Sequence, residues 1–490
     1  MSSHQVDMII IGGGINGMAI AGEAARLGLH IVLIEQNDIA SGTSSKSTQL
    51  IHGGLRYLQQ YDFSLVRKAL REREVLLKMA PHLIKPMEFI IPDVPSKTPR
   101  WLKRVGLFAY DYLSGYHSLP KAHILHLNNH FLKSDIHSGL VYSDAVTQDS
   151  RLVVEWALLA KQYGARILNY QAIQSLKETD TGWCVELEQA SYEAPVIVNA
   201  TGPWVSQSHQ RYFSDFDIPK MRLVKGSHLV LKKELPDDKA YFLECEDGRI
   251  IFLTPYEPGY SLLGTTELTY EGGLDKLKMT ETEISYLLEC VNRYVQVPFS
   301  RADIAASFAG LRPLLDDQVH DAHHLSRDYR LLLQESKKGH TLLTVLGGKL
   351  TTHRRLALDA LILLGKNRKN WPRIKEEPIL LPGGEAFDEK PYGFVPEAVL
   401  KRYRGSYGTL CRAWLEGKRT LLDLGEHFGA GLYQAEVDYL LAQEWVLRAE
   451  DLLWRRTRLG LNLDEVAVEK LEKYINTVIP AFAGMTKTLL

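Results

Sequence analysis

The hydrophobic pattern at the start of the chain predicts a strand, a helix and a second strand within residues 6–36. The run VDMIIIGGG is continuously apolar up to its glycines, as expected for a parallel strand that is buried on both faces. Apolar residues then recur at near-helical spacing from Ile15 to Leu27, and Gly28 ends this pattern before the apolar run HIVLIE. The segment therefore has the pattern of a βαβ unit of about the minimum length.

Later segments predict further helices and strands. Residues 62–80 have an amphipathic helical pattern that ends before Pro81, and residues 145–163 predict another helix. The run PVIVNATGPW (195–204) predicts a buried strand that ends in a glycine turn, and 340–365 predicts a strand, a Gly-Gly turn and a long helix. Short alternating runs within 222–272 predict an antiparallel sheet.

The remaining segments are less regular. Residues 92–130 are rich in proline, aromatic and basic residues, and we expect them to be irregular. Helical periodicity dominates from 385 to about 475, after a stretch that contains proline and glycine. The tail 476–490 fits no element and is a candidate for disorder.

Length and charge restrict the class of protein only broadly. A chain of 490 residues has room for two or three domains, and its 45% hydrophobic and 24% charged residues are typical of a soluble globular protein. The formal net charge of -1 gives no reason to expect a nucleic-acid partner. The first apolar run has no basic segment before it, so it predicts a strand and not a signal peptide. No apolar run reaches the roughly 18 residues that a transmembrane helix needs, so any membrane contact should be peripheral.

The four cysteines are scattered and form no CxxC pair. This argues against a zinc or iron–sulfur site, so no metal is expected, and against a disulfide scaffold. We therefore expect a reducing compartment. The cysteines are Cys184, Cys245, Cys290 and Cys411.

A dinucleotide fingerprint follows the first strand. Gly12, Gly14 and Gly17 form G-x-G-x-x-G, in which the glycines permit a tight turn, close approach of the pyrophosphate, and close packing of helix on strand. The amino end of the helix then faces the phosphates. Glu35 ends the second strand and can accept hydrogen bonds from the ribose hydroxyls. The flanking elements make dinucleotide binding a far stronger prediction than the glycines alone.

Three features favour FAD over NAD. The fingerprint lies at the extreme amino end, the hydroxyl-rich segment SGTSSKSTQ (41–49) follows closely, and IVNATGPW and LLTVLGGKLTT form two distant strand-to-glycine turns. Contacts from three distant segments suit a long cofactor. Each of these turns alone is also typical of an ordinary connection in an α/β protein.

Several longer motifs carry a family resemblance. They include SSKSTQLIHGGLRYLQQYDFSLVRKALREREVLLKMAPHL, KGSHLVL, IIFLTPY, LLGTTE, GLRPLLDD, SRDY, LGGKLTTHRRLA and DLLWRRTRLGL, in this order. Together they resemble the FAD-dependent glycerol-3-phosphate dehydrogenases of the aerobic, respiratory type, and more distantly the flavin-dependent amine and amino-acid oxidases. The resemblance extends from about residue 6 to about 460. Gln49 departs from it, because many relatives have Lys or Arg there.

The resemblance implies an α/β fold with three domains. These are a Rossmann-like FAD-binding domain, an antiparallel β-sheet substrate domain and a C-terminal α-helical domain. Their expected ranges are 1–90, 140–215 and 335–370 for FAD, 91–139 and 216–334 for substrate, and 385–475 for the helical domain.

The implied reaction is oxidation of sn-glycerol 3-phosphate to dihydroxyacetone phosphate, with hydride transfer to FAD. The electrons would pass to a membrane quinone, ubiquinone or menaquinone. The protein would be cytoplasmic and peripherally attached to the inner face of the cytoplasmic membrane, and a homodimer is left open.

The phosphate of such a substrate requires cations, and bidentate Arg is the best of them. Arg56, Arg312 and Arg327 are candidates, and the resemblance places Arg56 and Arg312, with Lys349, nearest the substrate. Tyr57 could add a hydroxyl contact. An arbitrary Arg is more often a surface or structural ion pair, but Arg312 lies in the apolar context GLRPL, where a charge needs a partner.

His52 is the first candidate for the base, because an ordinary imidazole pKa near 6.5 suits proton acceptance at neutral pH, whereas Arg stays charged. It could instead anchor its loop. His353 is a weaker candidate.

Gly347 and Gly348 let the backbone approach the flavin ring, and Lys349 and the following helix start could stabilise negative charge on it. The predicted cofactor contacts are Gly12, Gly14, Asn16, Gly17, Glu35, Thr43, Ser44, Ser45, Ser47, Thr48, Gly53, Gly54, Ala200, Thr201, Gly202, Trp204, Gly264, Gly347, Gly348, Lys349, Leu350 and Thr351.

Two basic segments with aromatic residues are candidates for a membrane contact. The first is 361–375, with five cations around Trp371, and the second is 99–113. Two alternative functions remain at this stage. One is an FAD-dependent oxidase of a small phosphorylated alcohol or amino acid that uses O2, and the other is a non-catalytic flavin-binding protein.

Overall fold

The computed structural model describes residues 3–55, 58, 62–95, 99–113, 115, 118–127, 130–316, 328–366 and 368–487, with the backbone alone for 480–487. Its first sheet has six strands in the order β19-β20-β12-β2-β3-β8, in which β19 is antiparallel to β20 and the other neighbours are parallel. These strands are β2 (Met8–Ile11), β3 (Ile31–Ile34), β8 (Arg166–Leu168), β12 (Val196–Asn199), β19 (Arg330–Glu335) and β20 (Thr341–Leu346).

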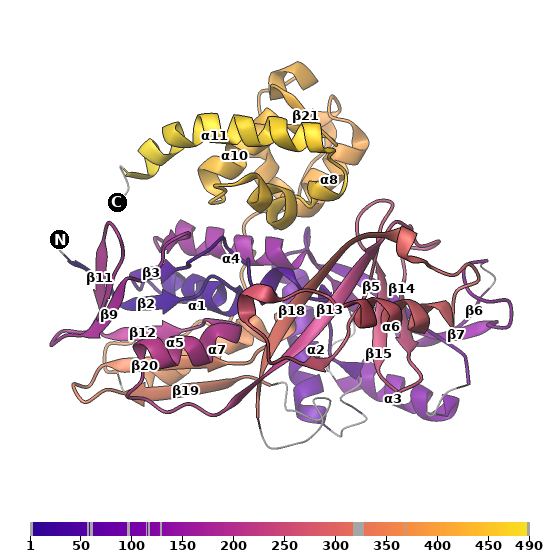
Figure 1. Ribbon diagram of the computed structural model, residues 1–490, viewed down its shortest axis with the longest axis horizontal. Helices are drawn as coiled ribbons and strands as arrows, with labels where there is room; N and C mark the ends of the chain where they lie inside the picture. The colour runs from indigo at the N-terminus through magenta and orange to yellow at the C-terminus, as the bar shows by residue number, and fades with distance from the viewer. Residues whose placement is uncertain are drawn as a thin grey trace.

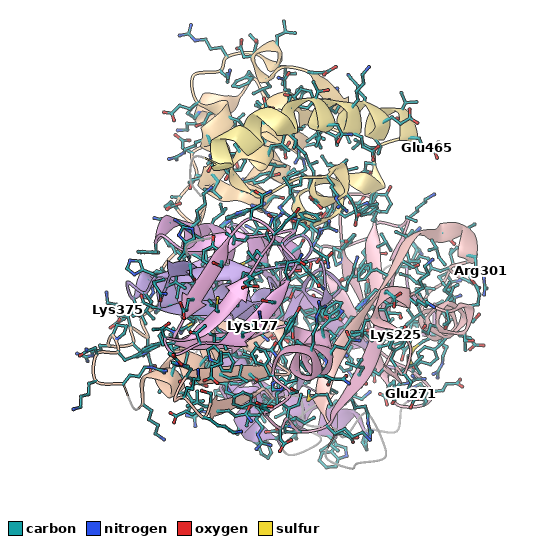
Figure 2. The ribbon with its side chains drawn as sticks, turned by 60° about the vertical axis from the view of Figure 1, so that its left-hand side comes forward. Lys177, Lys225, Glu271, Arg301, Lys375 and Glu465 are labelled. Carbon is teal, nitrogen blue, oxygen red and sulfur yellow. A yellow bond between two sulfur atoms is a disulfide. The ribbon has the colours of Figure 1, made fainter. Side chains whose placement is uncertain are left out.

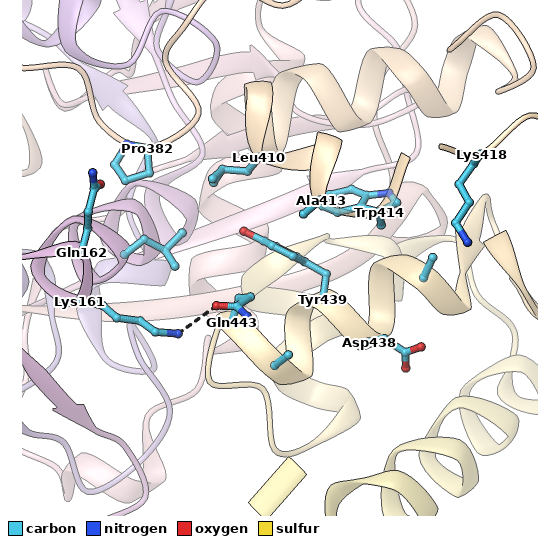
Figure 3. A pocket seen from close by; sticks show the side chains of 13 residues that line it. Lys161, Gln162, Pro382, Leu410, Ala413, Trp414, Lys418, Asp438, Tyr439 and Gln443 are labelled. Carbon is cyan, nitrogen blue, oxygen red and sulfur yellow. Dashed lines mark hydrogen bonds between the residues drawn. The ribbon is translucent and has the colours of Figure 1, made fainter. Parts of the chain in front are cut away.

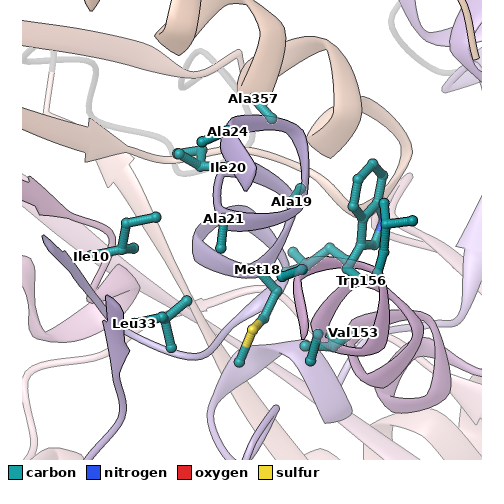
Figure 4. Close-up of a cluster of buried hydrophobic side chains, with 14 of the residues drawn as sticks. Ile10, Met18, Ala19, Ile20, Ala21, Ala24, Leu33, Val153, Trp156 and Ala357 are labelled. Carbon is teal, nitrogen blue, oxygen red and sulfur yellow. The ribbon is translucent and has the colours of Figure 1, made fainter. Parts of the chain in front are cut away.

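This sheet is covered on both faces, which explains why its strands are continuously apolar. One face packs on the helices α1 (Ile15–Arg26), α4 (Asp149–Gln162) and α7 (His353–Gly365). Figure 4 shows α1 lying between Ile10 and Leu33 of the sheet and Trp156 of α4. The other face packs on a small sheet that consists of β1 (Ser3–Gln5), β11 (Ser191–Ala194), β10 (Trp183–Glu186) and β9 (Ser175–Glu178).

The second domain is built on a ten-stranded sheet. Most neighbours are antiparallel, but β5 and β14 are parallel. Helix α6 (Glu281–Asn292) packs on one face, while α2 (Phe63–Met79) and α3 (Arg100–Leu113) pack on the other. The strands are β4 (Leu50–Ile51), β5 (Lys85–Pro92), β6 (His123–His126), β7 (Ser138–Val146), β13 (Met221–Leu231), β14 (Ala240–Glu244), β15 (Ile250–Pro255), β16 (Ser261–Gly264), β17 (Leu268–Thr269) and β18 (Ile304–Leu315).

The C-terminal domain is mainly helical and has its own apolar core. Figure 1 shows it above α4, on the side of the molecule opposite to α3. A hollow of about 820 Å³ lies between α4 and α10. Beside it, Lys161 Nζ of α4 donates a hydrogen bond to Gln443 Oε1 of α10 at 3.1 Å (Figure 3). The elements of this domain are α8 (Glu397–Tyr407), α9 (Arg412–Leu415), β21 (His427–Gly429), β22 (Leu432–Tyr433), α10 (Gln434–Gln443) and α11 (Glu465–Lys487).

The structure differs from the sequence-based expectations at four places. Residues 92–130 are not irregular throughout, because they contain α3. The tail is not without an element, because α11 continues to Lys487. The strands β5 and β7 cross the expected boundaries at 90 and 140, and both lie in the ten-stranded sheet together with β4, while the domain ranges themselves stay a prediction.

The fourth difference is a disulfide between Cys245 and Cys290, which the cysteine spacing did not predict. The two residues are 45 positions apart in sequence, one just after β14 and the other on α6. They meet because α6 packs across β14, and a tertiary contact of this kind leaves no local spacing motif. Cys184 and Cys411 are free thiols.

Candidate active site

The predicted fingerprint forms the floor of a cleft at the carboxyl ends of β2, β3 and β12. Gly12 has φ +110°, and a Cβ there would lie 2.6 Å from the Ala200 carbonyl oxygen. Both observations require glycine, because a side chain would be strained in this backbone conformation and would collide with β12. The turn therefore leaves open space above it that suits a pyrophosphate.

Several features of this cleft fit FAD. Helix α1 begins at Ile15 after the N-cap Gly14, and its first turn has no acidic residue. The Ile15 amide donates to Ser44 Oγ at 3.0 Å. Its positive end therefore faces the cleft with no carboxylate in that turn to offset it. Asn16 Nδ2 donates to the Gly347 carbonyl oxygen at 3.2 Å, which ties the fingerprint to the distant GGK turn. Asn16 Oδ1 is buried and has no hydrogen-bond partner in the described part of the chain, so it can accept one from a cofactor.

Glu35 has a structural contact in addition to its predicted one. Its Oε2 accepts a hydrogen bond from the Gly13 amide at 2.7 Å, and Oε1 accepts one from the Asn37 amide at 2.8 Å. Burial raises the pKa of this carboxyl above its ordinary value, although the backbone donors oppose that shift. Each oxygen retains a second lone pair, so the side chain can still receive ribose hydroxyls from the cleft.

Most of the predicted cofactor residues line the cleft and some do not. Those that line it are Gly12, Gly14, Asn16, Glu35, Thr43, Ser44, Ser47, Ala200, Thr201, Gly202, Trp204, Gly347, Gly348, Lys349 and Leu350. Outside its lining are Gly17, Ser45, Thr48, Gly53, Gly54, Gly264 and Thr351. Contact with FAD stays a prediction for the residues of both sets. Gly264 lies against the His228 ring, where a side chain would collide with that ring.

Sequence reasoning missed part of the cleft wall. Gln171, Arg211 and Tyr212 also line it, from the segment after β8 and from the helix α5 (Val205–Tyr212). Helix α5 begins directly after the predicted NATGPW turn, and this adjacency is the signal that could have indicated Arg211. Nothing in the local sequence marks Gln171.

His52 is held next to the GGKLTT segment. Its amide donates to Thr351 Oγ1 at 3.1 Å, and Thr351 Oγ1 in turn donates to the His52 carbonyl oxygen at 3.2 Å. The imidazole meets the Phe252 ring edge-on, with centroids 6.4 Å apart. Because Lys349 and Leu350 line the cofactor cleft, these two hydrogen bonds place the His52 backbone beside the segment that continues from the cleft wall. His52 itself is not among the lining residues.

Arg312 lies on β18, at the other side of the same turn. A Cβ on Gly347 would lie 3.6 Å from the carbonyl oxygen of Pro313, so β18 and the GGK turn are in contact there. Arg312 Nη1 is 3.3 Å from Glu267 Oε1, and the Arg312 side chain keeps 30% of its surface exposed. The arrangement orients one edge of the guanidinium and leaves the group accessible from solvent.

A buried histidine that sequence reasoning did not select lies beside Arg312. His228 Nε2 is 3.0 Å from Thr48 Oγ1, and its ring stacks on Phe308 at 5.0 Å. Burial, assisted by the Arg312 charge, lowers the pKa of His228 to about 3. His228 is therefore neutral near pH 7. Its place in the motif KGSH was the available signal.

His353 does not reach the cleft. Its Nε2 accepts a hydrogen bond from Trp156 Nε1 at 2.7 Å, so Nδ1 carries the proton and donates to the Leu350 carbonyl oxygen at 2.5 Å. Burial lowers the pKa of His353 to about 4. The histidine thus anchors the turn that precedes α7, and its candidacy as the base has no support in the geometry.

Some of the predicted substrate contacts fall outside the described residues. They are Arg56, Tyr57 and Arg327. Gln49 is described and buried, with φ +62°, and its carbonyl oxygen accepts the Thr147 amide at 2.9 Å. Gln49 therefore has a structural contact at the position where many relatives have a cation.

Residues 7–354 match the family model described as FAD dependent oxidoreductase, which covers well over half of the chain. The fingerprint, the cleft and the two distant glycine turns all lie within the matched range. The chain therefore belongs to the FAD dependent oxidoreductase family.

Within that family the chain is similar to named dehydrogenases of phosphorylated alcohols. The glycerol-3-phosphate dehydrogenase of Pseudomonas aeruginosa is 40% identical over 489 residues, which cover 97% of this chain and 96% of that protein. The aerobic glycerol-3-phosphate dehydrogenase of Escherichia coli is 41% identical over 481 residues, with 94% and 95% coverage. The D-erythritol 1-phosphate dehydrogenase of Brucella abortus is 40% identical over 482 residues, with 94% and 95% coverage.

A solved structure shows the same architecture. The glycerol-3-phosphate dehydrogenase from Bacillus halodurans, solved as a complex with FAD, has a TM-score of 0.74 and 25% identity and covers 100% of this chain and 95% of its own. The predicted family, fold class and cofactor are thus confirmed.

Proposed function

We propose that this chain oxidises sn-glycerol 3-phosphate to dihydroxyacetone phosphate. The observation that carries the proposal is the pair of hydrogen bonds between the His52 backbone and Thr351, because it holds the segment with this candidate proton acceptor next to the GGK turn of the cleft. Relatives named as glycerol-3-phosphate dehydrogenases align over nearly the whole chain, which supports this substrate.

The reaction removes a hydride from C2 of the alcohol and a proton from its hydroxyl. When bound, FAD supplies the hydride acceptor. The imidazole of His52 takes the hydroxyl proton, so the C2–O bond becomes a carbonyl bond as the C2–H bond breaks. Lys349, which lines the cleft, would offset the negative charge that reduction adds to the bound flavin.

Arg312 binds the phosphate in this proposal. Its contact with Glu267 fixes one edge of the guanidinium, and the opposite edge, Nη2, lies near Gly226, where a Cβ would be 3.4 Å away. The Arg312 side chain keeps 30% of its surface exposed, so phosphate oxygens can approach the oriented guanidinium from solvent. Arg56, Tyr57 and Arg327 stay predicted partners of the same phosphate.

Anaerobic titration of the FAD-loaded protein tests the reaction directly. Glycerol 3-phosphate should bleach the flavin absorbance near 450 nm, while unphosphorylated glycerol should not. Equal bleaching by glycerol would contradict the phosphate assignment, and no bleaching by any alcohol would favour a non-catalytic flavin protein.

The role of Arg312 has a matched control at the other end of β18. Arg312→Ala should raise KM for glycerol 3-phosphate more than about a hundredfold, because charge-assisted hydrogen bonds contribute roughly 1.5–3 kcal/mol each. Arg301 also pairs with a glutamate, Glu281, at 2.9 Å, but it lies at the outer edge of the domain (Figure 2). Arg301→Ala should leave KM within about twofold. Equal effects of the two substitutions would refute phosphate binding by Arg312.

A four-carbon phosphorylated polyol is the second candidate substrate. The Brucella abortus relative named as a D-erythritol 1-phosphate dehydrogenase is as similar to this chain as the glycerol-3-phosphate dehydrogenases are. D-erythritol 1-phosphate therefore belongs in the same titration, and the larger kcat/KM decides between the two substrates.

We also propose that the electrons pass to a membrane quinone, from a protein attached to the cytoplasmic membrane surface through helix α3. The exposed side of α3 carries Trp101, Val105 and Phe108, which are 67%, 55% and 64% exposed. Arg100, Lys103 and Arg104 lie on the same helix. An apolar stripe with adjacent cations suits an anionic lipid surface.

The alternative segment, 361–375, fits this role less well. Trp371 is half-buried and packs against Gly365 and the core of the FAD-binding domain. Its aromatic ring is therefore already used inside the protein. No helix in the described part of the chain has both the length and the apolar character needed to span a bilayer.

Vesicles of phosphatidylglycerol and phosphatidylethanolamine test the α3 surface. Trp101→Ser/Phe108→Ser should lower vesicle binding at low salt at least tenfold. The control Leu422→Ser/Val466→Ser removes side chains that are 90% and 75% exposed in the C-terminal domain, on the far side of the molecule, and should leave binding unchanged (Figure 1). Equal losses would refute docking through α3.

With quinone and O2 both present, an oxidase would release hydrogen peroxide, whereas the proposed dehydrogenase should reduce the quinone.

A further inference from the structure

A buried polar cluster lies directly under the segment that carries His52. The Gly53 amide donates to Tyr110 Oη at 2.8 Å and approaches Asp144 Oδ1 at 3.4 Å. Tyr110 Oη donates in turn to Asp144 Oδ2 at 2.7 Å, and Arg73 Nη1 donates to Asp144 Oδ1 at 2.7 Å. These three side chains come from α3, β7 and α2, and each is at least 94% buried.

Filling the interior with such a cluster gives little stability for the polar groups that it buries. Buried polar and charged groups are generally no more stabilising than well-packed apolar side chains of the same volume, so their presence calls for another explanation. Arg73 also donates to the Ser143 carbonyl oxygen at 2.9 Å and to Glu74 at 2.8 Å, so the guanidinium is fixed from three sides. The cluster is therefore rigid, and it directs its hydroxyl to the amide that follows His52.

The backbone around His52 is thus held from two opposite sides. Thr351 binds both the amide and the carbonyl of His52 on the cofactor side, and Tyr110 binds the next amide on the sheet side. Gly53 is tightly packed on the sheet side, because a Cβ there would lie 2.5 Å from Leu70 Cδ2 and 2.7 Å from Tyr110 Oη. Glycine at 53 lets the backbone come close enough for the hydrogen bond to form.

We propose that Tyr110, supported by Asp144 and Arg73, is a positioning residue for His52. It fixes the peptide that carries the imidazole, so that the base is aligned with the substrate hydroxyl before the substrate binds. Pre-alignment of this kind accelerates the chemical step without strengthening substrate binding. The inference rests on the proposed role of His52 as the base.

The test measures flavin reduction by glycerol 3-phosphate in an anaerobic stopped-flow instrument with FAD-loaded protein. Tyr110→Phe should slow the limiting rate of reduction about 10- to 100-fold, while the substrate concentration at half-saturation changes less than threefold. The matched control is Tyr142→Phe. Tyr142 is also buried, its ring meets that of Tyr110 edge-on at 5.8 Å, and no hydrogen bond of the described residues joins it to Gly53. It should stay within about twofold of the unmodified protein.

A double substitution separates positioning from a general structural effect. If Tyr110 acts through His52, then His52→Gln/Tyr110→Phe should be no slower than His52→Gln alone, because the group being positioned is already absent. Multiplied losses in the double variant would overturn the inference, and so would an unchanged rate in Tyr110→Phe. An unchanged rate in His52→Gln would instead refute the proposed base.

A second variant keeps the test valid if Tyr110→Phe fails to retain FAD. Arg73→Lys preserves the positive charge beside Asp144 but cannot donate to Asp144, Ser143 and Glu74 in the same planar geometry. We expect a threefold to tenfold slower limiting rate, with an unchanged apparent pKa in the pH profile and loss of this effect in the His52→Gln background. A rate equal to that of the unmodified protein would count against positioning.

Discussion

The C-terminal domain is held on the FAD-binding domain by a buried guanidinium, and Arg456→Met should loosen that attachment. Arg456 is fully buried and donates to both oxygens of Asp38, each at 2.9 Å. It also donates twice to the Glu444 carbonyl oxygen, at 2.8 and 3.1 Å. Although burial opposes the shift, the charges of Arg456 and Arg455 hold the pKa of Asp38 below its ordinary value.

The expected loss of stability follows from these contacts. Methionine has a similar length and can fill most of the space, so the main effect is the loss of one of the two arginines that pair with Asp38. Removing one partner of a buried ion pair costs about 3–5 kcal/mol when the other charge is left unpaired, and because Asp38 keeps Arg455 we expect the lower end, about 3 kcal/mol. At about 2.1 cal/mol/K per residue, unfolding of 490 residues has an entropy near 1 kcal/mol/K. The melting temperature should therefore fall by about 3 °C if the domains unfold together.

Differential scanning calorimetry of the FAD-loaded protein measures this change. The matched control is Arg404→Met, because Arg404 pairs with Glu389 inside the C-terminal domain with both side chains more than 40% exposed. An exposed pair contributes about 0–1 kcal/mol, so Tm should fall by less than about 1 °C. A drop in Arg456→Met no larger than that of the control would refute the reasoning that the buried pair joins the two domains.

Three further predictions concern the cofactor turn, acid stability and the thiols. Gly12→Ala should abolish FAD retention, measured as flavin absorbance per protein. The control is Gly28→Ala, because Gly28 also has a positive φ but open space around it. It should retain FAD and lower the free energy of unfolding by only about 1–2 kcal/mol. His228 and His353 have folded pKa values of about 3 and about 4, below the ordinary 6.5, so the unfolded state binds more protons in acid. Each histidine should lower the free energy of unfolding by about 1.4 kcal/mol per pH unit as pH falls from 6.5 to 4. Urea unfolding at several pH values measures this change, and a free energy of unfolding that does not vary with pH in this range would contradict it. Denatured protein should show two reactive thiols before reduction and four after it, and four before reduction would exclude the disulfide.

The cofactor half of the protein was predictable from local sequence. Buried parallel strands, glycine turns and helix ends are encoded by neighbouring residues, so β2, α1 and β3 lie within a few residues of their predicted positions. The turn after β12 and the GGK turn after β20 were predicted to contact one long cofactor, and both line the same cleft. They meet there because the carboxyl ends of parallel strands lie at one edge of the sheet.

The reaction half depends on contacts that no local pattern encodes. Thr351 and His52 are 299 positions apart, and Tyr110 and Gly53 are 57 apart. The importance of Tyr110 could not be read from its surroundings in sequence, because an aromatic residue on a helix is more often simply part of the core. The role of His228 is similarly set by Arg312 and Thr48, which reach it from other segments.

Helix α3 shows a different limit of sequence patterns. Apolar residues at 101, 105, 108 and 112 recur at helical spacing, so the helix itself was predictable. A stripe of this kind usually faces the core of the protein, but here it faces solvent, while Leu107 and Tyr110 on the other side are buried. Periodicity indicates that a helix has an apolar face and says nothing about which partner covers it. Because the buried side of α3 already has its partner in the sheet, its exposed apolar stripe with adjacent cations supports the proposed contact with a lipid bilayer.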